Sequence, residues 1–122
     1  MSAKILVLEN DKDILEIITL ILSDNGIDVL PTSHDNLFKD LFGYQPQLLI
    51  LDHMQTAEKR DLAIFQEIHS YSNFNSLPII LISASFHIDE FAKSCKATAY
   101  IPKPFDIDFF KNTVTKVLVA VA

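Results

Sequence analysis

Glycine is scarce in this chain, which has only Gly26 and Gly43 among its 122 residues. A phosphate-binding loop and a dinucleotide-binding fingerprint both need several glycines at short, fixed spacing, because backbone N–H groups must approach the phosphates closely. Two isolated glycines cannot form either motif. The sequence therefore excludes nucleotide binding through a glycine-rich loop.

Cysteine, positive charge and long apolar runs are also scarce. Cys95 is the single cysteine, so no internal disulfide can form, and packing within a helix is its expected role. The net charge is −6 and no basic run occurs, which argues against a nucleic-acid-binding surface. Every apolar run is far shorter than the roughly 20 residues needed to span a bilayer. We expect a cytoplasmic protein that binds neither nucleic acid nor membrane directly.

What the sequence does contain is five short aliphatic runs that predict β-strands. The first, third and fourth runs are continuously apolar, as in strands that are buried on both faces of a sheet. The five runs are Ile5–Leu8, Ile27–Leu30, Leu48–Leu51, Ile79–Ile82 and Ala99–Ile101.

Segments with helical spacing of apolar residues separate these runs. In the first of them, Asp13 and Glu16 resemble a capping box and Gly26 is a suitable residue just after the helix end. In the last, Asp106 is the expected N-cap. The predicted helical segments are the stripe Ile14, Ile17, Ile18, Ile21 and Leu22; residues 37–43; the stripe Leu62, Phe65 and Ile68; residues 87–95; and the stripe Phe110, Val114, Val117, Leu118 and Val121.

Strict alternation of strands and helices predicts an α/β fold with a parallel sheet covered by helices on both faces. Five such units over residues 1–122 favour one domain of the flavodoxin-like (βα)5 type, with strand order 2-1-3-4-5 and right-handed crossovers. In that order the first and third strands are neighbours. Ligands of such sheets bind at the carboxyl ends of the strands where the order reverses.

Polar residues with complementary chemistry follow the predicted strand ends. Glu9 and Asn10 follow the first strand, Asp52 the third, Ser83 the fourth and Lys103 the fifth. Carboxylate and amide oxygens suit Mg²⁺. A carboxylate can also be the nucleophile that forms an acyl phosphate, while an ammonium and a hydroxyl hold phosphoryl oxygens. This combination predicts transfer of a phosphoryl group to a carboxylate.

Four segments carry a resemblance to a known family. They are Lys4–Ile14, Leu48–Met54, Leu77–Ala84 and Tyr100–Phe105, and together they extend over most of the chain. In combination they resemble the receiver domain of two-component response regulators. The separation of 51 positions between Asp52 and Lys103 is close to the spacing in that family.

The resemblance implies a role for each matching residue. Asp52 matches the phospho-acceptor, Ser83 the residue whose hydroxyl meets the phosphoryl group, and Lys103 the lysine that pairs with it. Tyr100 matches an aromatic switch residue that swings inward on activation. The resemblance also implies a cis peptide bond between Lys103 and Pro104, an isomer that bonds before proline adopt at low cost.

The resemblance further implies a metal site and partners. Glu9, Asn10, Asp52 and the backbone carbonyl of Met54 match the ligands of Mg²⁺. A histidine kinase or a phosphotransfer protein would be the phosphodonor. A downstream protein would bind the face formed by the fourth helix, fifth strand and fifth helix, and the fourth-helix face could also support a homodimer. The chain would modify itself without turning over a substrate, so we expect no enzyme activity.

Several positions depart from the family pattern and keep alternatives open. Asn10 replaces an acid, and Asp11 lies beside it as a candidate substitute. Arg60 and Lys96 stand where glycines are common, and the fourth helix is expected to be short. One alternative is a pseudo-receiver that binds partners without phosphorylation. Another is a small phosphatase or nucleotide-binding enzyme that uses Asp52 and needs an acid or base nearby; His53 is adjacent, although we expect its side chain to be exposed.

Overall fold

The computed structural model describes residues 2–121, with the side chain of Val121 left out. Met1 and Ala122, the two ends of the predicted 1–122 domain, lie outside the described residues, as does the side chain of Val121 that was predicted for the last stripe. The elements in chain order are β1 (Lys4–Leu8), α1 (Lys12–Asp24), β2 (Asp28–Thr32), α2 (Leu37–Tyr44), β3 (Leu48–Asp52), a 3-10 turn (Gln55–Ala57), α3 (Glu58–Ser70), β4 (Ile79–Ser83), α4 (Ile88–Cys95), β5 (Ala99–Pro102) and α5 (Ile107–Val121).

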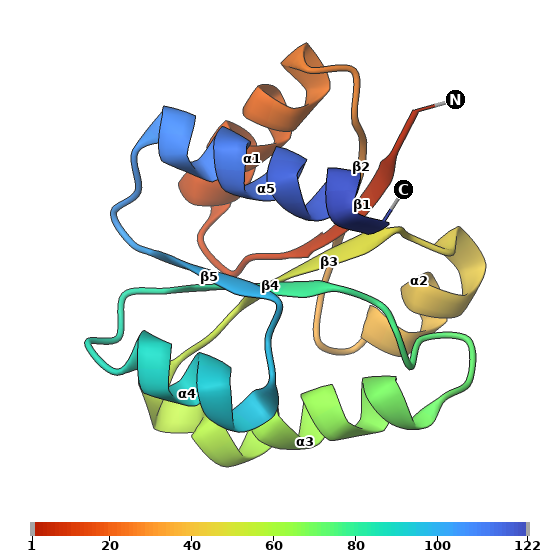
Figure 1. Ribbon diagram of the computed structural model, residues 1–122, viewed down its shortest axis with the longest axis vertical. Coiled ribbons are helices and arrows are strands. Elements are labelled where there is room, and N and C mark those ends of the chain that lie inside the picture. The colour runs from red at the N-terminus through yellow and green to blue at the C-terminus, as the bar shows by residue number, and fades with distance from the viewer. Residues whose placement is uncertain (1, 122) are drawn as a thin grey trace.

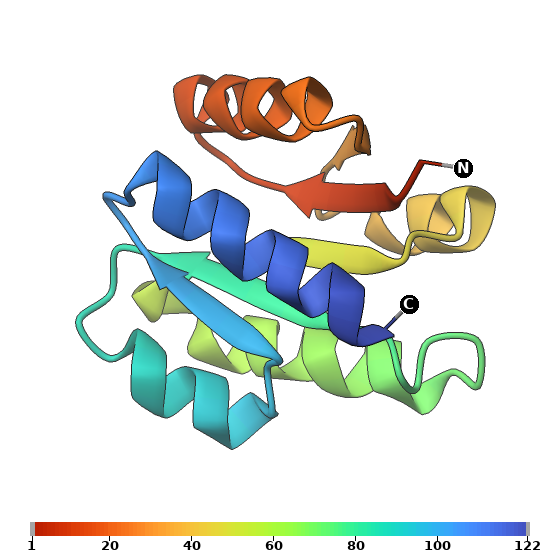
Figure 2. The same cartoon turned by 45° about the horizontal axis from the view of Figure 1, so that its top comes forward.

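The five strands form one parallel sheet in the order β2-β1-β3-β4-β5, which confirms the predicted topology. Helices α1 and α5 cover one face of the sheet, and α2, α3 and α4 cover the other (Figures 1 and 2). The molecule therefore has three layers, with the sheet in the middle.

The alternating side chains of the strands divide the core into two parts. In β3, Ile50 packs with residues of α1 and α5, whereas Leu49 and Leu51 pack with residues of α2, α3 and α4. All five residues of β3 and of β4 are buried. Burial on both faces explains why these strands are continuously apolar in sequence.

Strands β2, β3, β4 and β5 each extend beyond their predicted ends, and in β3 and β4 this extension positions polar residues. Asp52 pairs with Ile82 in the β3–β4 register, and Ser83 pairs with Pro102 in the β4–β5 register. Both polar residues are thus the last residues of central strands. They are held by the sheet and not by a loop.

The first helix begins differently from the predicted capping box. Asp11 is the N-cap, with extended backbone angles, and its Oδ1 accepts hydrogen bonds from the backbone N–H groups of Asp13 and Ile14. The prediction that Asp13 and Glu16 form a capping box is therefore wrong, because Asp13 already lies within the helix. Gly26 follows the helix with φ +74°, as expected, since a residue with a Cβ is strained there.

The start of α5 and the short α4 agree with the sequence, whereas α2 ends at Tyr44, one residue beyond the predicted Gly43. The Oδ2 atom of Asp106 accepts a hydrogen bond from the N–H of Phe109 and so caps α5. Helix α4 has only eight residues and ends at Lys96, which adopts the left-handed conformation with φ 61°. Cys95 is buried in the packing of this helix.

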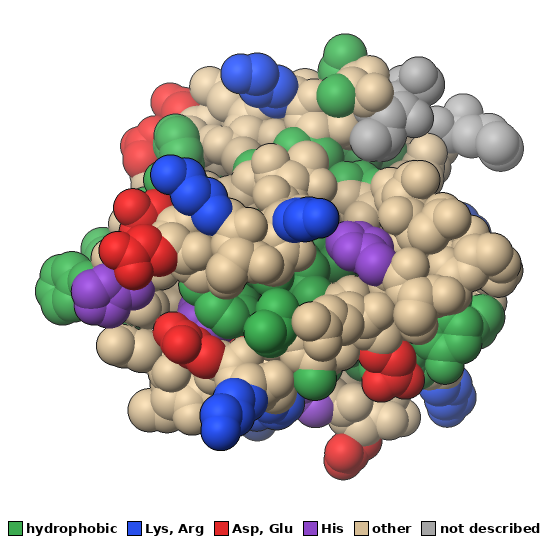
Figure 3. All heavy atoms as spheres, turned by 60° about the horizontal axis from the view of Figure 1, so that its bottom comes forward, with side chains coloured by type: hydrophobic (Ala, Val, Ile, Leu, Met, Phe, Trp, Pro, Cys, Tyr) green, Lys and Arg blue, Asp and Glu red, His purple; other side chains and the backbone are tan. Residues whose placement is uncertain are grey.

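Charge distribution and helix composition bear on binding to nucleic acid and to membranes. On the face seen in Figure 3, basic and acidic side chains are interspersed and form no continuous basic strip of the kind that binds nucleic acid. Among residues 2–121, no helix combines the length and the apolar character that crossing a membrane requires.

The packing of α5 leads to a prediction of stability. Phe110 is fully buried and stacks on Phe105 with ring centroids 5.0 Å apart. We expect Phe110→Ala to lower the free energy of unfolding by about 3–5 kcal/mol, because it leaves a cavity between α5 and the sheet. Urea unfolding measures this change. The neighbouring Phe109 is 49% exposed, so Phe109→Ala should cost only about 1 kcal/mol; equal losses for the two variants would contradict the assigned packing.

Candidate functional site

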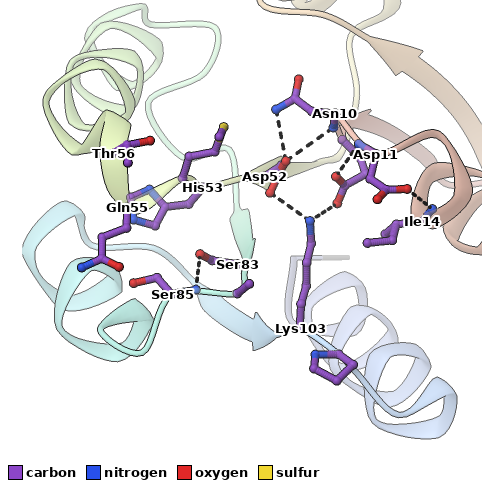
Figure 4. A pocket seen from close by; sticks show the side chains of 14 residues that line it. Asn10, Asp11, Ile14, Asp52, His53, Gln55, Thr56, Ser83, Ser85 and Lys103 are labelled. Atoms are coloured by element: carbon purple, nitrogen blue, oxygen red, sulfur yellow. Dashed lines mark hydrogen bonds and ion pairs between the residues drawn. The ribbon is translucent and has the colours of Figure 1, made fainter.

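A cleft lies at the carboxyl ends of β1, β3, β4 and β5 (Figure 4). It is lined by all but one of the residues singled out in the sequence, namely Glu9, Asn10, Asp52, Met54, Ser83 and Lys103. The parallel topology collects them, since their strands all end at the same edge of the sheet. Tyr100 lies outside this cleft.

The ammonium of Lys103 lies between two carboxylates at the centre of the site. Its Nζ is 2.7 Å from Oε1 of Glu9, a close ion pair. It donates a hydrogen bond of 3.1 Å to Oδ1 of Asp52. All three groups are largely removed from water, since Glu9 and Asp52 are each 6% exposed and the Lys103 side chain is 13% exposed.

The backbone fixes the place of this lysine. The N–H of Lys103 donates a hydrogen bond of 2.8 Å to the carbonyl of Ser83, which continues the pairing of β4 with β5. The peptide bond from Lys103 to Pro104 is cis, as predicted.

Asn10 engages the second oxygen of Asp52. Its side-chain Nδ2 donates to Oδ2 of Asp52 at 3.1 Å, and its backbone N–H donates to the same oxygen at 3.4 Å. The two oxygens of Asp52 therefore face different donors, Lys103 on one side and Asn10 on the other. In this arrangement Asn10 presents its amide nitrogen to Asp52 and must turn its amide over before its oxygen can ligate a cation there.

Asp11, the neighbour of Asn10, holds the start of α1 and contacts Glu9. Its carboxylate caps α1, and its backbone N–H donates a hydrogen bond of 3.0 Å to Oε2 of Glu9. Asp11 thus orients Glu9 through its backbone, while one oxygen of its carboxylate holds the start of α1.

The pKa values of the central pair reflect burial and their mutual contact. Burial raises the pKa of Glu9, and the contacts with Lys103 and with the backbone of Asp11 offset this only in part. Burial works against the charge of Lys103, but its contacts with Glu9 and Asp52 outweigh that effect and raise the pKa of Lys103. The ammonium therefore keeps its charge inside the cleft, at the place where negative charge gathers.

Ser83 and Met54 line the same cleft, but neither forms a hydrogen bond with the side chain of Asp52. Ser83 is 1% exposed, and its Oγ accepts a hydrogen bond of 3.0 Å from the N–H of Ser85. The carbonyl of Met54 accepts a hydrogen bond of 2.9 Å from the N–H of Ala57. A carbonyl oxygen has a second lone pair, so this bond leaves room for a further ligand.

Tyr100 points outward from β5 and is 40% exposed. It lines a second groove, bounded by α4, β5 and α5, together with Phe109 and three lysines, Lys93, Lys96 and Lys116. The structure thus separates Tyr100 from the other predicted site residues. Its role as a switch remains a prediction.

His53 corrects one expectation from the sequence. It is 2% exposed, and its ring lies on the side of α3 and α4, away from Lys103 (Figure 4). Its Nδ1 lies 2.6 Å from Oδ2 of Asp61, a fully buried carboxylate in the first turn of α3. The expectation of an exposed side chain is wrong, because α3 and α4 close over this position. Asp61 was not singled out from the sequence, where it reads as an ordinary acidic residue near a helix start.

The donor set at the cleft suits a hard cation only modestly. Glu9 and Asp52 both face the position of the Lys103 ammonium. Met54 has a neutral carbonyl oxygen at the cleft, and Asn10 would add another only after its amide turns over. Among the residues that the structure describes, no group of three or more acidic, histidine or cysteine side chains has the geometry of a metal site. A Mg²⁺ ion here would have two carboxylates, Glu9 and Asp52, and otherwise neutral oxygens as protein ligands, with one negative charge fewer than a three-acid site.

The contact between Glu9 and Lys103 predicts a measurable titration. In metal-free protein the Glu9 carboxyl should titrate above its ordinary pKa, and Lys103→Met should raise that pKa further, because the nearby cation is removed. Carbon-13 shifts of the side-chain carboxyl measure this, with the exposed Glu16 as the reference signal.

The raised pKa also fixes the sign of the stability change. Ionising a buried carboxyl costs free energy, so the wild type should lose stability relative to Glu9→Gln as the pH rises. The loss should begin at the ordinary pKa of glutamate and be complete above the raised pKa of Glu9 in the folded state. A Glu9 that titrates at or below the ordinary value would contradict this description of the site.

Comparisons with known proteins agree with the fold. No protein-family model and no curated protein sequence matches the chain. Solved structures do: a response regulator from Thermotoga maritima has 18% identity and a TM-score of 0.85 over 98% of this chain and 99% of that chain. A response regulator receiver protein from Burkholderia phymatum has 25% identity and a TM-score of 0.79 over 97% and 96%.

A longer protein shows the same likeness over part of its length. NtrX from Brucella abortus has 27% identity and a TM-score of 0.83, and the match covers 99% of this chain but only 27% of NtrX. The topology, the strand-end cleft and these structures lead to one conclusion. The chain has the receiver fold of two-component response regulators and is a structural relative of their receiver domains.

Proposed function

We propose that this chain is a phospho-acceptor receiver domain in which Asp52 takes a phosphoryl group from a histidine kinase or a phosphotransfer protein. The observation that carries the proposal is the placement of Asp52 at the end of a central strand, with Lys103 on one carboxylate oxygen and Asn10 on the other. A carboxylate fixed in this way, in the lining of the cleft, is positioned as a nucleophile.

In the proposed step an oxygen of Asp52 attacks the phosphorus of a phosphohistidine. The phosphorus–nitrogen bond of the donor breaks, its electron pair stays on the imidazole, and an acyl phosphate forms on Asp52. The ammonium of Lys103 lies 3.1 Å from Oδ1 of Asp52, so it can follow the charge onto the phosphoryl oxygens with little movement. The hydroxyl of Ser83, on the neighbouring strand, is a second candidate donor to those oxygens.

We propose Mg²⁺ as the cofactor, held by Glu9, Asp52, the carbonyl of Met54 and, after rotation of its amide, Asn10. When bound, the ion would neutralise charge on the transferring group. Lys103 now lies between Glu9 and Asp52, so these two residues would have to share their negative charge between the lysine and the ion.

The proposed output is a shift between two states of the face formed by α4, β5 and α5. Ser83 would turn toward the phosphoryl group and Tyr100 would move inward from its exposed position. The groove beside Tyr100 lies on that face, so a downstream protein there would be sensitive to this movement. The chain would act as a signalling module that modifies itself, without turnover of a substrate.

One rival has an observation in its favour. The Asp52 carboxylate is satisfied by Lys103 and Asn10 alone, and a pseudo-receiver that binds partners without phosphorylation needs no more than this. A phosphatase that uses Asp52 gains no such support. The imidazole of His53 is enclosed by Asp61 and Phe91, so it is not a base for water in the cleft.

The acceptor role is tested by chemical phosphorylation. Wild-type protein incubated with a small phosphodonor and Mg²⁺ should gain the mass of one phosphoryl group, and Asp52→Asn should gain none, because an amide is not a nucleophile toward phosphorus. Intact-mass spectrometry measures the gain. If the wild-type protein stays unmodified, and its NMR spectrum does not change when beryllofluoride is added, the pseudo-receiver is supported instead.

The role of Asn10 is tested by restoring the acid. Asn10→Asp should lower the Mg²⁺ concentration at half-maximal phosphorylation by roughly tenfold, since it adds a charged ligand in place of a neutral one. Asp11→Asn is the matched control, because asparagine keeps the cap of α1 and the Asp11 carboxylate faces the helix. If Asp11→Asn raises that Mg²⁺ concentration as much as Asn10→Asp lowers it, general charge, and not ligation by residue 10, governs the metal dependence.

A further inference from the structure

A second polar centre lies beside the cleft, on the side of α3 and α4. His53 and Asp61 form its core, with Nδ1 of His53 2.6 Å from Oδ2 of Asp61 and both side chains fully buried. A carboxylate has only acceptors, so Nδ1 of His53 carries the hydrogen. Burying this pair is costly, since its groups lose their hydration on folding.

Asp61 also holds the backbone that follows the acceptor residue. The same Oδ2 atom accepts a hydrogen bond of 3.2 Å from the N–H of Met54. One carboxylate oxygen therefore joins the side chain of His53 and the peptide of Met54 to α3. The other oxygen accepts a hydrogen bond of 3.2 Å from Nε of Arg60, whose side chain is 43% exposed.

Phe91 fixes the plane of the imidazole. The rings of His53 and Phe91 are stacked, with centroids 3.9 Å apart and planes inclined by 7°. Phe91 lies in α4 and is itself buried. The ring of His53 is thus held at its edge by α3 and on its face by α4, while its Nε2 is buried and makes no hydrogen bond.

These contacts act on the residues that carry the proposed chemistry. His53 directly follows Asp52, and Met54 supplies the carbonyl proposed as a metal ligand. Two of the three successive residues 52–54 are thereby tied to the same carboxylate of α3. Groups that orient ligating atoms in this way commonly change metal affinity or activity by about 10–100-fold when they are removed.

We propose that His53 and Asp61 are positioning residues of the acceptor site, which hold the Met54 peptide and the end of β3 in the geometry needed for metal binding and phosphoryl transfer. This inference rests on the proposed phospho-acceptor function. Neither residue touches the reacting atoms; both act through the backbone that leads from Asp52 into Met54.

The inference is tested first without metal or phosphodonor. Asp61→Leu removes the acceptor shared by His53 and Met54, so the amide hydrogen of Met54 should exchange with solvent about tenfold faster or more. Asp61→Asn keeps an oxygen for both donors and should restore most of the protection. Hydrogen exchange followed by NMR measures each rate, with circular dichroism to establish that each variant is folded.

Mg²⁺ titration followed by the amide shifts near Asp52 is the second measurement. His53→Leu and Asp61→Leu should weaken Mg²⁺ binding about tenfold, whereas His53→Asn, which keeps an N–H donor near the place of Nδ1, should weaken it less. His69→Asn is the matched control. This substitution removes another imidazole of α3, whose Nε2 contacts the carbonyl of Leu77. It should leave Mg²⁺ binding unchanged.

The outcomes separate this inference from the function on which it rests. Suppose that the wild type is phosphorylated, and that Asp61→Leu or His53→Leu folds and keeps the wild-type rate of Met54 amide exchange and the wild-type Mg²⁺ affinity. The positioning role is then wrong and the acceptor function stands. If wild type is never phosphorylated, the acceptor function fails. If the leucine variants do not fold, the proposal is tested on the wild type alone. A nitrogen-15 NMR spectrum that places the ring hydrogen of His53 on Nε2 would overturn it. A Met54 amide hydrogen that exchanges freely with solvent would also overturn it.

Discussion

The ion pair contacts of Lys103 with Glu9 and Asp52 are the interaction on which the site depends. They connect the ends of β1, β3 and β5 through one ammonium that is nearly removed from water. Two buried carboxylates this close repel each other, and an internal cation offsets that repulsion. Any cation or phosphoryl group that enters the cleft must therefore redistribute these contacts. The lysine is both the element that stabilises the resting cleft and the nearest positive charge to an incoming anion.

A second polar centre supports the first from the opposite side of the strand end. His53, Asp61 and the Met54 amide form a hydrogen-bonded unit between β3, α3 and α4. The side chain of Asp52 lies in the cleft, while that of His53 lies against the helices, as expected of consecutive residues at the end of a strand. Polar contacts thus hold the end of β3 from both directions, although β3 and β4 are otherwise apolar except for Ser83.

Much of the site could be predicted because parallel topology is a strong constraint. Once the order 2-1-3-4-5 is accepted, Glu9, Asp52, Ser83 and Lys103 must meet at one edge of the sheet, whatever the details of packing. Details that depend on single side-chain directions could not be predicted in the same way. The cap of α1 belongs to Asp11 and not to Asp13, and Asn10 turns its amide nitrogen to Asp52. Each of these depends on competition between nearby donors, which sequence spacing does not resolve.

By itself, the sequence determined the alternation of strands and helices, the two-sided burial of β3 and β4, and the helix ends at Gly26 and Asp106. These features depend on local hydrogen bonding and on the period of apolar residues, and both follow from residues that are close together in the sequence. Only the tertiary structure decided that His53 is buried, that Asp61 is its partner, and that Tyr100 lies in a separate groove. The reason is physical: burial at position 53 depends on Asp61 and Phe91, which approach it only when α3 and α4 pack on the same face of the sheet.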